Sequence, residues 1–337
     1  MRSINPLASE PTNRKFDADR FVPAWWLPGP HLPTLWAALI RRRSLPAVRH
    51  ERLELTDGDF LDLCWAGTSN GPLVAVLHGL EGSSRSKYAI ALLERIERRG
   101  WGGVIMQFRG CSGEPNRRDR SYHAGDTRDF EFLLATLEKR YPNRQIMAVG
   151  YSLGGNVLLK HLGQSSNSTR LSAAAAISVP FDLGAAANRL NKGLSKLYQH
   201  HLVGSLQAKI RTKFRELRPP IPFGELGKWN DFWSFDNNVT APLHGFKNVH
   251  EYYARSSCRQ YLRAITIPTL VIHSRDDPFL STDAIPSADE LSNTTELILT
   301  QHGGHVGFVS GHNPFKPRYW IDDHLMAWFE SYRDTRP

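Results

Sequence analysis

A serine between two glycines is the residue in this sequence best placed for covalent chemistry. Ser152 lies in the segment GYSLG, residues 150–154, which fits the G-x-S-x-G pattern of a nucleophile elbow. In such an elbow a tight strand-to-helix turn strains the serine, and a side chain at either glycine would clash with a neighbouring strand or helix. The apolar run 145–150 and the segment 156–163 supply the required strand and helix. We predict that Ser152 is a nucleophile rather than an inert serine in a glycine-rich turn.

Candidate partners for this serine follow two later apolar runs. A serine hydroxyl attacks efficiently when a histidine accepts its proton, and a carboxylate orients that histidine. Asp276 and Asp277 follow one run, and His302 and His305 follow the next, in the chain order serine, aspartate, histidine. We prefer Asp277 because it precedes a proline and so lies in a turn. We prefer His305 because two glycines before it let the backbone fold back toward the serine. Asp276 and His302 then have loop-holding roles.

The oxyanion of an attacked carbonyl group needs two backbone N–H donors. The amide of Leu153, directly after the serine, is expected to be one of them. The second is expected from the loop HGLEG, residues 78–82, which follows the apolar run 73–77 and matches the HG-type oxyanion loop. Leu80 is the preferred donor in this loop. His78 is interpreted as structural rather than as a base.

These chemical groups need a scaffold, and the hydrophobic pattern predicts an α/β fold. Residues 51–65 indicate a hairpin that turns at Asp57-Gly58. Strands are expected at 73–79, 103–108, 145–150, 173–180, 269–274 and 296–301, and helices at 86–99, 126–141, 156–163 and 319–333. Alternating strands and helices of this length predict a mostly parallel central sheet with helices on both faces.

Residues 181–263 interrupt this alternation and are predicted to form a cap over one end of the sheet. The segment contains an amphipathic stretch near 183–217, followed by a stretch rich in aromatic and turn residues. Four of its aromatic side chains suit an apolar acyl chain: Phe232, Trp233, Phe235 and Phe246. The alternative is that they only pack the interior of the cap.

Composition excludes several classes of protein. The chain has 337 residues, a net charge of +9 and 41% hydrophobic residues, which is ordinary globular composition. Its basic residues are scattered and accompany no nucleic-acid-binding motif, so no nucleic-acid partner is predicted. Three cysteines without paired spacing, and no signal-peptide pattern, favour a cytoplasmic location. No metal-binding or cofactor-binding motif is found, so neither a metal nor a cofactor is expected.

Residues 1–50 are expected to form an aromatic and proline-rich arm, followed by one catalytic domain over 51–337. The segment 21–40 has the length of a membrane span, but its four prolines remove backbone donors that a helix in lipid must satisfy. We interpret it as an arm packed on the domain. Peripheral membrane contact is the alternative, through Trp25, Trp26 and Trp36 and the following Arg41–Arg43.

The motifs taken together resemble the YheT-like subgroup of the α/β-hydrolases, AB hydrolase family 4. The segments that carry this resemblance are HGLEGSS (78–84), FRGCSGEPNR (108–117), GYSLGGN (150–156), TAPLHGF (240–246), SRDDPF (274–279) and HGGHVGF (302–308). The resemblance covers roughly residues 20–330. It implies an α/β-hydrolase fold, a triad of Ser152, Asp277 and His305, and an esterase or lipase type of reaction. Eukaryotic members carry an N-terminal membrane anchor, where this sequence has only the proline-broken arm.

The expected function is hydrolysis of a small-molecule or lipid carboxylic ester by a serine esterase. One alternative is acyl transfer by the same triad to an alcohol other than water. A second alternative is a non-catalytic binding protein on a hydrolase scaffold, which the intact set of serine, aspartate, histidine and HG loop disfavours. Acyl chain length, head group and oligomeric state are left open by the sequence.

Overall fold

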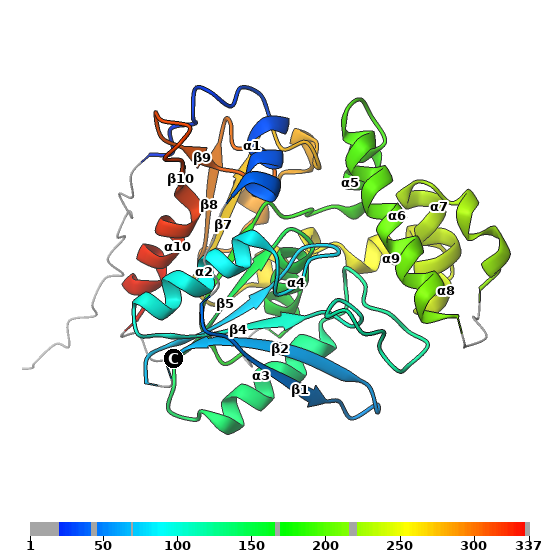
Figure 1. The fold of residues 1–337 in the computed structure, drawn as a ribbon, viewed down its shortest axis with the longest axis horizontal. Coiled ribbons are helices and arrows are strands. Elements are labelled where there is room, and N and C mark those ends of the chain that lie inside the picture. Colours follow the sequence, from blue (N-terminus) through cyan, green and yellow to red (C-terminus); the bar gives the residue numbers. More distant parts are fainter. Residues whose placement is uncertain (1–19, 42–45, 69, 166–168, 216–220, 334–337) are drawn as a thin grey trace, which may run out of the picture.

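The computed structural model describes residues 20–41, 46–68, 70–165, 169–215 and 221–333. An eight-stranded sheet forms its centre, in the order β1-β2-β4-β3-β5-β6-β7-β8 (Figure 1). The strands are β1 Arg49–Glu54, β2 Phe60–Gly67, β3 Leu73–Leu77, β4 Gly102–Gln107, β5 Ile146–Tyr151, β6 Leu171–Ile177, β7 Thr269–Ser274 and β8 Thr295–Thr300. β1 and β2 form the predicted hairpin, β2 runs antiparallel to β4, and all other neighbours are parallel. The predicted mostly parallel sheet is confirmed.

Helices cover both faces of the sheet, as predicted. α2 Lys87–Arg98 and α10 Trp320–Ser331 pack their apolar residues on one face, in a core shared with alternate residues of the strands. α3 Arg128–Arg140 and α4 Leu153–Ser165 cover the other face. The strands β3 to β7 are buried along their whole length, which explains their continuous apolar runs.

The segment 181–263, called the cap here, is helical among its described residues and lies together at one end of the molecule (Figure 1). Its α-helices are α5 Leu183–Leu190, α6 Ser195–Lys213, α7 Phe232–Phe235, α8 Ala241–Leu243 and α9 Val249–Ser256. The amphipathic stretch near 183–217 is two helices, because the chain turns at Gly193 with a φ of 53°. Residues 216 and 217 of that stretch lie outside the described residues. The strand predicted at 173–180 ends at Ile177, because Ser178 has a φ of 51°.

The described part of the arm, residues 20–41, packs along the domain beside the last strands. Pro23 forms a β-bridge with Ser310, and α1 His31–Leu35 is followed by a π-helical turn, Trp36–Ile40. β9 Val309–Ser310 and β10 Arg318–Tyr319 form a two-stranded sheet at this side. The arm ends in a buried ion pair between Arg41 and Asp322 of α10. The described residues of the arm therefore contact the domain through a β-bridge and a buried ion pair.

The three tryptophans of the arm differ in exposure. Trp25 is 74% exposed, whereas Trp26 and Trp36 pack edge-on against each other with ring centroids 4.8 Å apart. The alternative, contact of the arm with a membrane, would therefore involve Trp25 more than the other two tryptophans. Arg42 and Arg43 lie outside the described residues. No helix within the described ranges is both long and apolar enough to cross a membrane.

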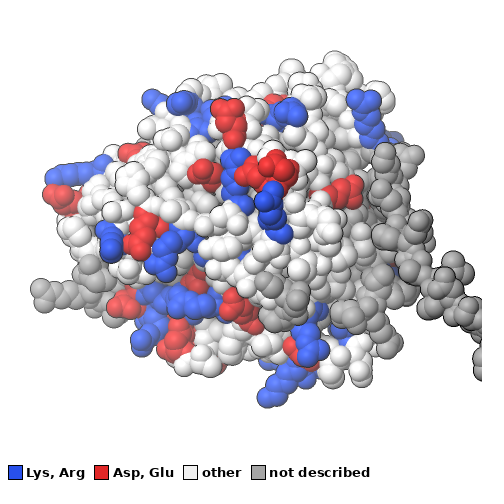
Figure 2. Space-filling view, turned by 180° about the vertical axis from the view of Figure 1, so that it is seen from behind, with Lys and Arg blue, Asp and Glu red and all other residues white. Residues whose placement is uncertain are grey.

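Charged side chains of both signs are mixed on the face shown in Figure 2, where cationic and anionic groups lie next to one another. Ion pairs lie within the β1–β2 hairpin and between it and the loop that follows β4. Arg52 bonds both Asp62 and Glu114, and Arg117 bonds Glu54. Such exposed pairs contribute little stability, ~0–1 kcal/mol each. These basic side chains are therefore paired with nearby carboxylates and do not form one continuous positive surface.

Helix α4 is held against the domain by a contact that only glycine permits. A Cβ atom added at Gly163 would lie 2.2 Å from the carbonyl oxygen of Tyr261, in the 3₁₀ segment Arg259–Ala264 at the end of the cap. Two backbones therefore touch at this point. The same helix carries Ser152 at its N-terminal turn, so this contact ties the end of the cap to the element that holds the serine.

Gly163→Ala is expected to lower the free energy of unfolding by about 1–3 kcal/mol, because the methyl group forces two backbones apart. Gly204→Ala in α6 is the matched control, since nothing lies within 4 Å of a Cβ added there. That control is expected to raise the free energy of unfolding by up to about 1 kcal/mol. Urea denaturation measures both values. Equal stability of Gly163→Ala and wild type would contradict a rigid contact between the two segments.

Candidate active site

Ser152 lies on the turn between β5 and α4 in a conformation that its neighbours enforce. Its φ of 52° is in the left-handed region, and its amide donates to the carbonyl of Ile177 at 2.8 Å. A Cβ atom at Gly150 would lie 2.4 Å from the carbonyl oxygen of Gly154. A Cβ atom at Gly154 would lie 2.5 Å from the carbonyl oxygen of Leu77. Both glycines of the motif are therefore required by close backbone contacts, as the sequence pattern predicts.

A continuous chain of hydrogen bonds joins the serine to the two predicted partners. The Nε2 atom of His305 lies 2.9 Å from Oγ of Ser152, and its Nδ1 atom lies 2.8 Å from Oδ2 of Asp277. The Asp277 side chain is only 1% exposed, and that of His305 is 11% exposed. With a proton on Nδ1, Nε2 is free to accept the serine proton. The arrangement has the geometry of a nucleophile, a base and an orienting carboxylate.

His305 is held from three sides. Its backbone amide donates to Oγ1 of Thr34 in the arm at 2.8 Å, and the next amide, of Val306, donates to Oγ of Ser178 at 2.9 Å. The ring of Phe279 stacks on the imidazole, with centroids 4.0 Å apart and planes 12° apart. These contacts limit rotation of the imidazole, so the ring stays aligned between the serine and the carboxylate.

The two residues that were not preferred from the sequence, Asp276 and His302, lie together beside Asp277 and His305. Asp276 accepts a hydrogen bond from the amide of Gly304 at 3.0 Å, and its other oxygen lies 3.3 Å from Nδ1 of His302. His302 is 65% exposed in its side chain. Asp276 therefore bridges the loop after β7 to the loop that carries His305, which is the role expected for the carboxylate that is not in the triad.

The loop 78–82 presents the Leu80 amide between two amides that are already occupied. The amide of Gly79 donates to the hydroxyl of Tyr88 at 2.8 Å, and that of Glu81 donates to the hydroxyl of Tyr122 at 3.0 Å. The Leu80 amide has no hydrogen-bond acceptor within the described ranges. It is the donor in this loop that is left for a ligand oxygen.

The second predicted oxyanion donor, Leu153, is the first residue of α4. The first N–H groups of a helix have no partner within the helix, and they carry partial positive charge.

His78 shapes the loop 78–82, because its Nε2 accepts from the Phe108 amide at 3.1 Å and its Nδ1 donates to the Gly79 carbonyl at 2.7 Å. Burial lowers the pKa of His78 to about 4, so this histidine is neutral and structural.

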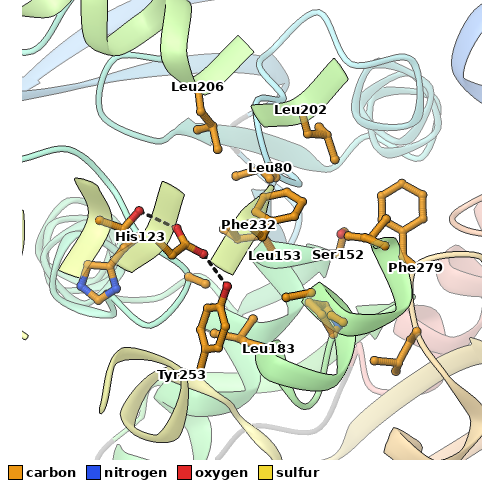
Figure 3. Close-up of a pocket in the computed structure, with 18 of the residues that line it drawn as sticks. Leu80, His123, Ser152, Leu153, Leu183, Leu202, Leu206, Phe232, Tyr253 and Phe279 are labelled. Atoms are coloured by element: carbon orange, nitrogen blue, oxygen red, sulfur yellow. Dashed lines mark hydrogen bonds between the residues drawn. The ribbon is translucent and has the colours of Figure 1, made fainter. Parts of the chain in front are cut away.

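A hollow of about 860 Å³, including its open mouth, extends from Ser152 beneath the cap; we call it the cap cavity. Figure 3 shows Ser152 on one side of it, His123 and Tyr253 on the other, and apolar side chains between them. These apolar residues come from the oxyanion loop, α4 and the cap helices: Leu80, Leu153, Leu183, Ala186, Ala187, Leu190, Leu202, Leu206 and Phe232. The apolar lining of the cavity suits a hydrocarbon chain.

Only one of the four aromatic residues predicted to form an acyl pocket lines this cavity. Phe232 does so, whereas the other three pack inside the cap. Trp233 packs edge-on against Tyr253 and donates its indole N–H to Asn188, Phe235 is 3% exposed in the core, and Phe246 packs edge-on against His123. The pocket assignment of Trp233, Phe235 and Phe246 is therefore corrected to cap packing. The side chains in their place are leucines and alanines of α5 and α6.

The side of the cap cavity away from the serine is polar. Asp236 accepts from the hydroxyl of Thr240 at 2.6 Å and from that of Tyr253 at 2.8 Å, as the dashed lines in Figure 3 show. Burial raises the pKa of Asp236 to about 6. Burial also lowers the pKa of His123 well below its ordinary value, so this histidine is neutral where it lines the cavity wall.

Three contacts at the site were not predicted from the sequence. Thr34 and Phe279 hold His305, and Tyr122 holds the oxyanion loop, where its hydroxyl also donates to the Glu81 carboxylate at 2.7 Å. Phe279 follows Asp277 closely in the chain, which is a usable signal. Thr34 and Tyr122 are far from the motifs in the sequence, and no local pattern points to them. Within the described ranges no group of three metal-ligating side chains is close enough to hold a metal ion.

Comparison with known proteins identifies the family. A model of the alpha/beta hydrolase fold matches residues 72–311. YheT of Escherichia coli, to which esterase activity is ascribed, is 39% identical over 322 residues, which cover 94% of each chain. Phospholipase ABHD3 of Bos taurus is 29% identical over 89% of this chain and 76% of its own. The monoacylglycerol lipase of Saccharomyces cerevisiae is 30% identical over 78% of this chain and 60% of its own. The chain belongs to the α/β-hydrolase family and to its YheT-like subgroup.

Solved structures show the same fold at low sequence identity. The Pyrococcus furiosus esterase Pf2001 aligns over 85% of this chain and 88% of its own, with a TM-score of 0.54 and 18% identity. A bacterial membrane phospholipase A aligns over 90% of this chain and 93% of its own, with a TM-score of 0.54 and 15% identity. At this level of identity the comparison bears on the fold alone.

Asp236→Asn is expected to remove a pH dependence of stability. The Asp236 pKa of about 6 lies above its ordinary value of 3.8, so the protonated acid favours the folded state. This contribution is fully present below about pH 4 and is lost as pH rises through about 6. Relative to wild type, the variant should therefore gain about 3 kcal/mol of unfolding free energy between pH 4 and pH 7.5. Urea denaturation at both pH values measures the difference, and a constant difference would contradict the raised pKa.

Proposed function

We propose that this protein is a serine esterase that hydrolyses carboxylic esters through Ser152, His305 and Asp277. The observation that carries the proposal is the unbroken hydrogen-bond chain, 2.9 Å from serine to histidine and 2.8 Å from histidine to aspartate. A non-catalytic scaffold has no need to keep all three groups in bonding register. Esterase and lipase names among the relatives support the same reaction class.

In the proposed mechanism, His305 accepts the proton of Ser152 as Oγ attacks the ester carbonyl carbon. The buried carboxylate of Asp277 stabilises the imidazolium that forms. The C–O bond to the alcohol then breaks, and the imidazolium returns its proton to the departing alkoxide. This leaves an acyl group on Ser152. A water molecule, deprotonated by His305, attacks that acyl group and releases the acid and the free serine.

The amides of Leu80 and Leu153 are proposed to stabilise the oxyanion. Each belongs to backbone that is already fixed, one by the tyrosine hydroxyls on either side of it and the other by α4. Donors held in place before the reaction need no reorganisation when charge develops, which is the main source of their effect.

The substrate is proposed to be a small-molecule or lipid ester whose acyl chain enters the cap cavity. The apolar lining of that cavity supports this choice, as do the phospholipase and monoacylglycerol lipase names of relatives. Cys64, Cys111 and Cys258 are all free thiols, which supports the proposal of a reducing, cytoplasmic location. The mechanism uses no cofactor.

Ser152→Ala is expected to lower kcat for ester hydrolysis by about 10⁶-fold, because loss of one triad member disables the triad as a unit. Initial rates on 4-nitrophenyl acetate measure the effect. A fluorophosphonate probe, which reacts only with an activated serine, should label wild type and not the variant. Retained turnover in a correctly folded Ser152→Ala protein would contradict the serine mechanism.

Asp277→Asn is expected to lower kcat by about 10⁴-fold, because asparagine does not stabilise the imidazolium and favours the wrong imidazole tautomer. Asp276→Asn is the matched control, one residue away and outside the hydrogen-bond chain. It should lose much less activity, since it bonds the Gly304 amide and His302 rather than His305. If the two losses are reversed in order, Asp276 is the carboxylate of the triad.

A further inference from the structure

A second hollow meets the cap cavity at Ser152 and lies beneath the N-terminal arm. It measures about 1130 Å³ including its open mouth, and we call it the arm cavity. The two hollows share five residues around the reacting atoms: Leu80, Ser152, Leu202, Phe279 and His305. The serine therefore lies where two separate spaces join. An ester has two halves that diverge from the attacked carbon, so each space can receive one of them.

The arm cavity lies on the side of the site formed by the histidine loop. Val306 lines this cavity and not the cap cavity, whereas Leu153 and Ser178 line only the cap cavity. The arm is built directly onto the histidine loop. Thr34 accepts from the His305 amide, and a Cβ atom at Gly304 would lie 2.5 Å from the Pro30 carbonyl oxygen. No movement of the arm is needed for the cavity to border the imidazole.

The direction of proton transfer indicates which cavity receives the alcohol half of the ester and which receives the acyl half. The departing alkoxide receives its proton from Nε2 of His305, so the alcohol half of the ester must lie next to the histidine. The acyl half stays on Ser152 after the alcohol leaves. His305 borders both spaces, but the next residue of its loop, Val306, lines only the arm cavity, which is therefore assigned to the alcohol. The cap cavity, which borders the start of α4, is the space for the acyl chain.

The walls that belong to the arm cavity alone are mostly hydrocarbon. The arm supplies Leu35, Ala37, Ala38 and Leu39, and the histidine loop supplies Val306. Leu35 and Leu39 are 40% and 65% exposed, so apolar surface faces the hollow and its mouth. A small polar alcohol would leave this surface in contact with water, whereas an alkyl chain would remove it from water.

We propose that the arm cavity binds the alcohol half of the substrate and that this half carries a hydrocarbon chain. The substrate class is then an ester with apolar groups on both sides of the ester bond. This assignment rests on the proposed function of Ser152 and deepens it. It also gives the arm a role in specificity, through the backbone and side chains of residues 34–39.

The test compares two esters of similar size below their solubility limits: octyl acetate, with an eight-carbon alcohol, and methyl octanoate, with an eight-carbon acyl chain. The measured quantity is the ratio of kcat/KM for octyl acetate to that for methyl octanoate. Ala38→Phe, which adds a ring inside the arm cavity, should lower the ratio about tenfold or more. Leu206→Trp, which narrows only the cap cavity, should raise it by a similar factor.

Leu32→Phe is the matched control, because Leu32 lies in α1, directly before the π-helical turn that holds Ala38, is 45% exposed and lines neither cavity. Its ratio should equal that of wild type. A ratio unchanged in Ala38→Phe, or changed in the opposite direction, overturns the assignment of the arm cavity. If Ala38→Phe does not fold, the smaller change Ala38→Leu tests the same direction.

Failure of this inference is distinguishable from failure of the proposed function. Suppose that Ser152→Ala loses all hydrolysis, but the ratio of kcat/KM values is the same in wild type and in the cavity variants. This result overturns only the assignment of the arm cavity to the alcohol. Persistence of hydrolysis of both esters in Ser152→Ala overturns the serine mechanism, and the inference with it.

Discussion

The left-handed backbone of Ser152 is the constraint on which the rest of the site depends. A non-glycine residue in this region is strained by roughly 1–3 kcal/mol, and the surrounding structure must enforce it. Here the enforcement comes from the backbone: the serine amide bonds the end of β6, and its carbonyl accepts from the Asn156 amide in α4 at 3.1 Å. Gly150 and Gly154 allow the strand and helix to approach closely enough for both bonds.

The same kind of strain recurs around the site. The non-glycine residues with positive φ, within the described ranges, are Glu81, Ser152, Ser178, Val306 and Phe308. They belong to the oxyanion loop, the elbow, the end of β6 and the histidine loop. Each sits where a strand ends and the chain must turn to present a group to one point. The central sheet makes this possible, because parallel strands end at the same edge and rigidly hold the loops that follow them.

Two peripheral segments, the arm and the cap, supply the remaining contacts and walls around Ser152. The arm contributes Thr34, which anchors the histidine loop, and the apolar walls of one cavity. The cap contributes the walls of the other cavity, and its helix α6 reaches the oxyanion loop through Lys209. This ammonium lies 2.6 Å from the Glu81 carboxylate, which also accepts from Tyr122. The cavity walls and the loops that carry Leu80 and His305 are therefore in direct contact, so a change in the cap or arm is expected to reach Ser152 and His305.

The sequence by itself determined the sheet, the elbow and the members of the hydrogen-bond chain. Buried parallel strands appear as continuous apolar runs, and an elbow needs glycines at set positions, so both leave local patterns. Asp277 and His305 were also identified, from the proline and glycines beside them. The cavity walls were decided only by tertiary structure. From the sequence, Trp233 and Phe246 were predicted to line a pocket, yet helix packing directs their side chains toward the interior of the cap. The contact between the arm and His305 joins residues that are 271 positions apart in the chain. Which side chains line a cavity depends on how helices that are distant in the sequence pack together. Residue type and local spacing do not indicate this packing.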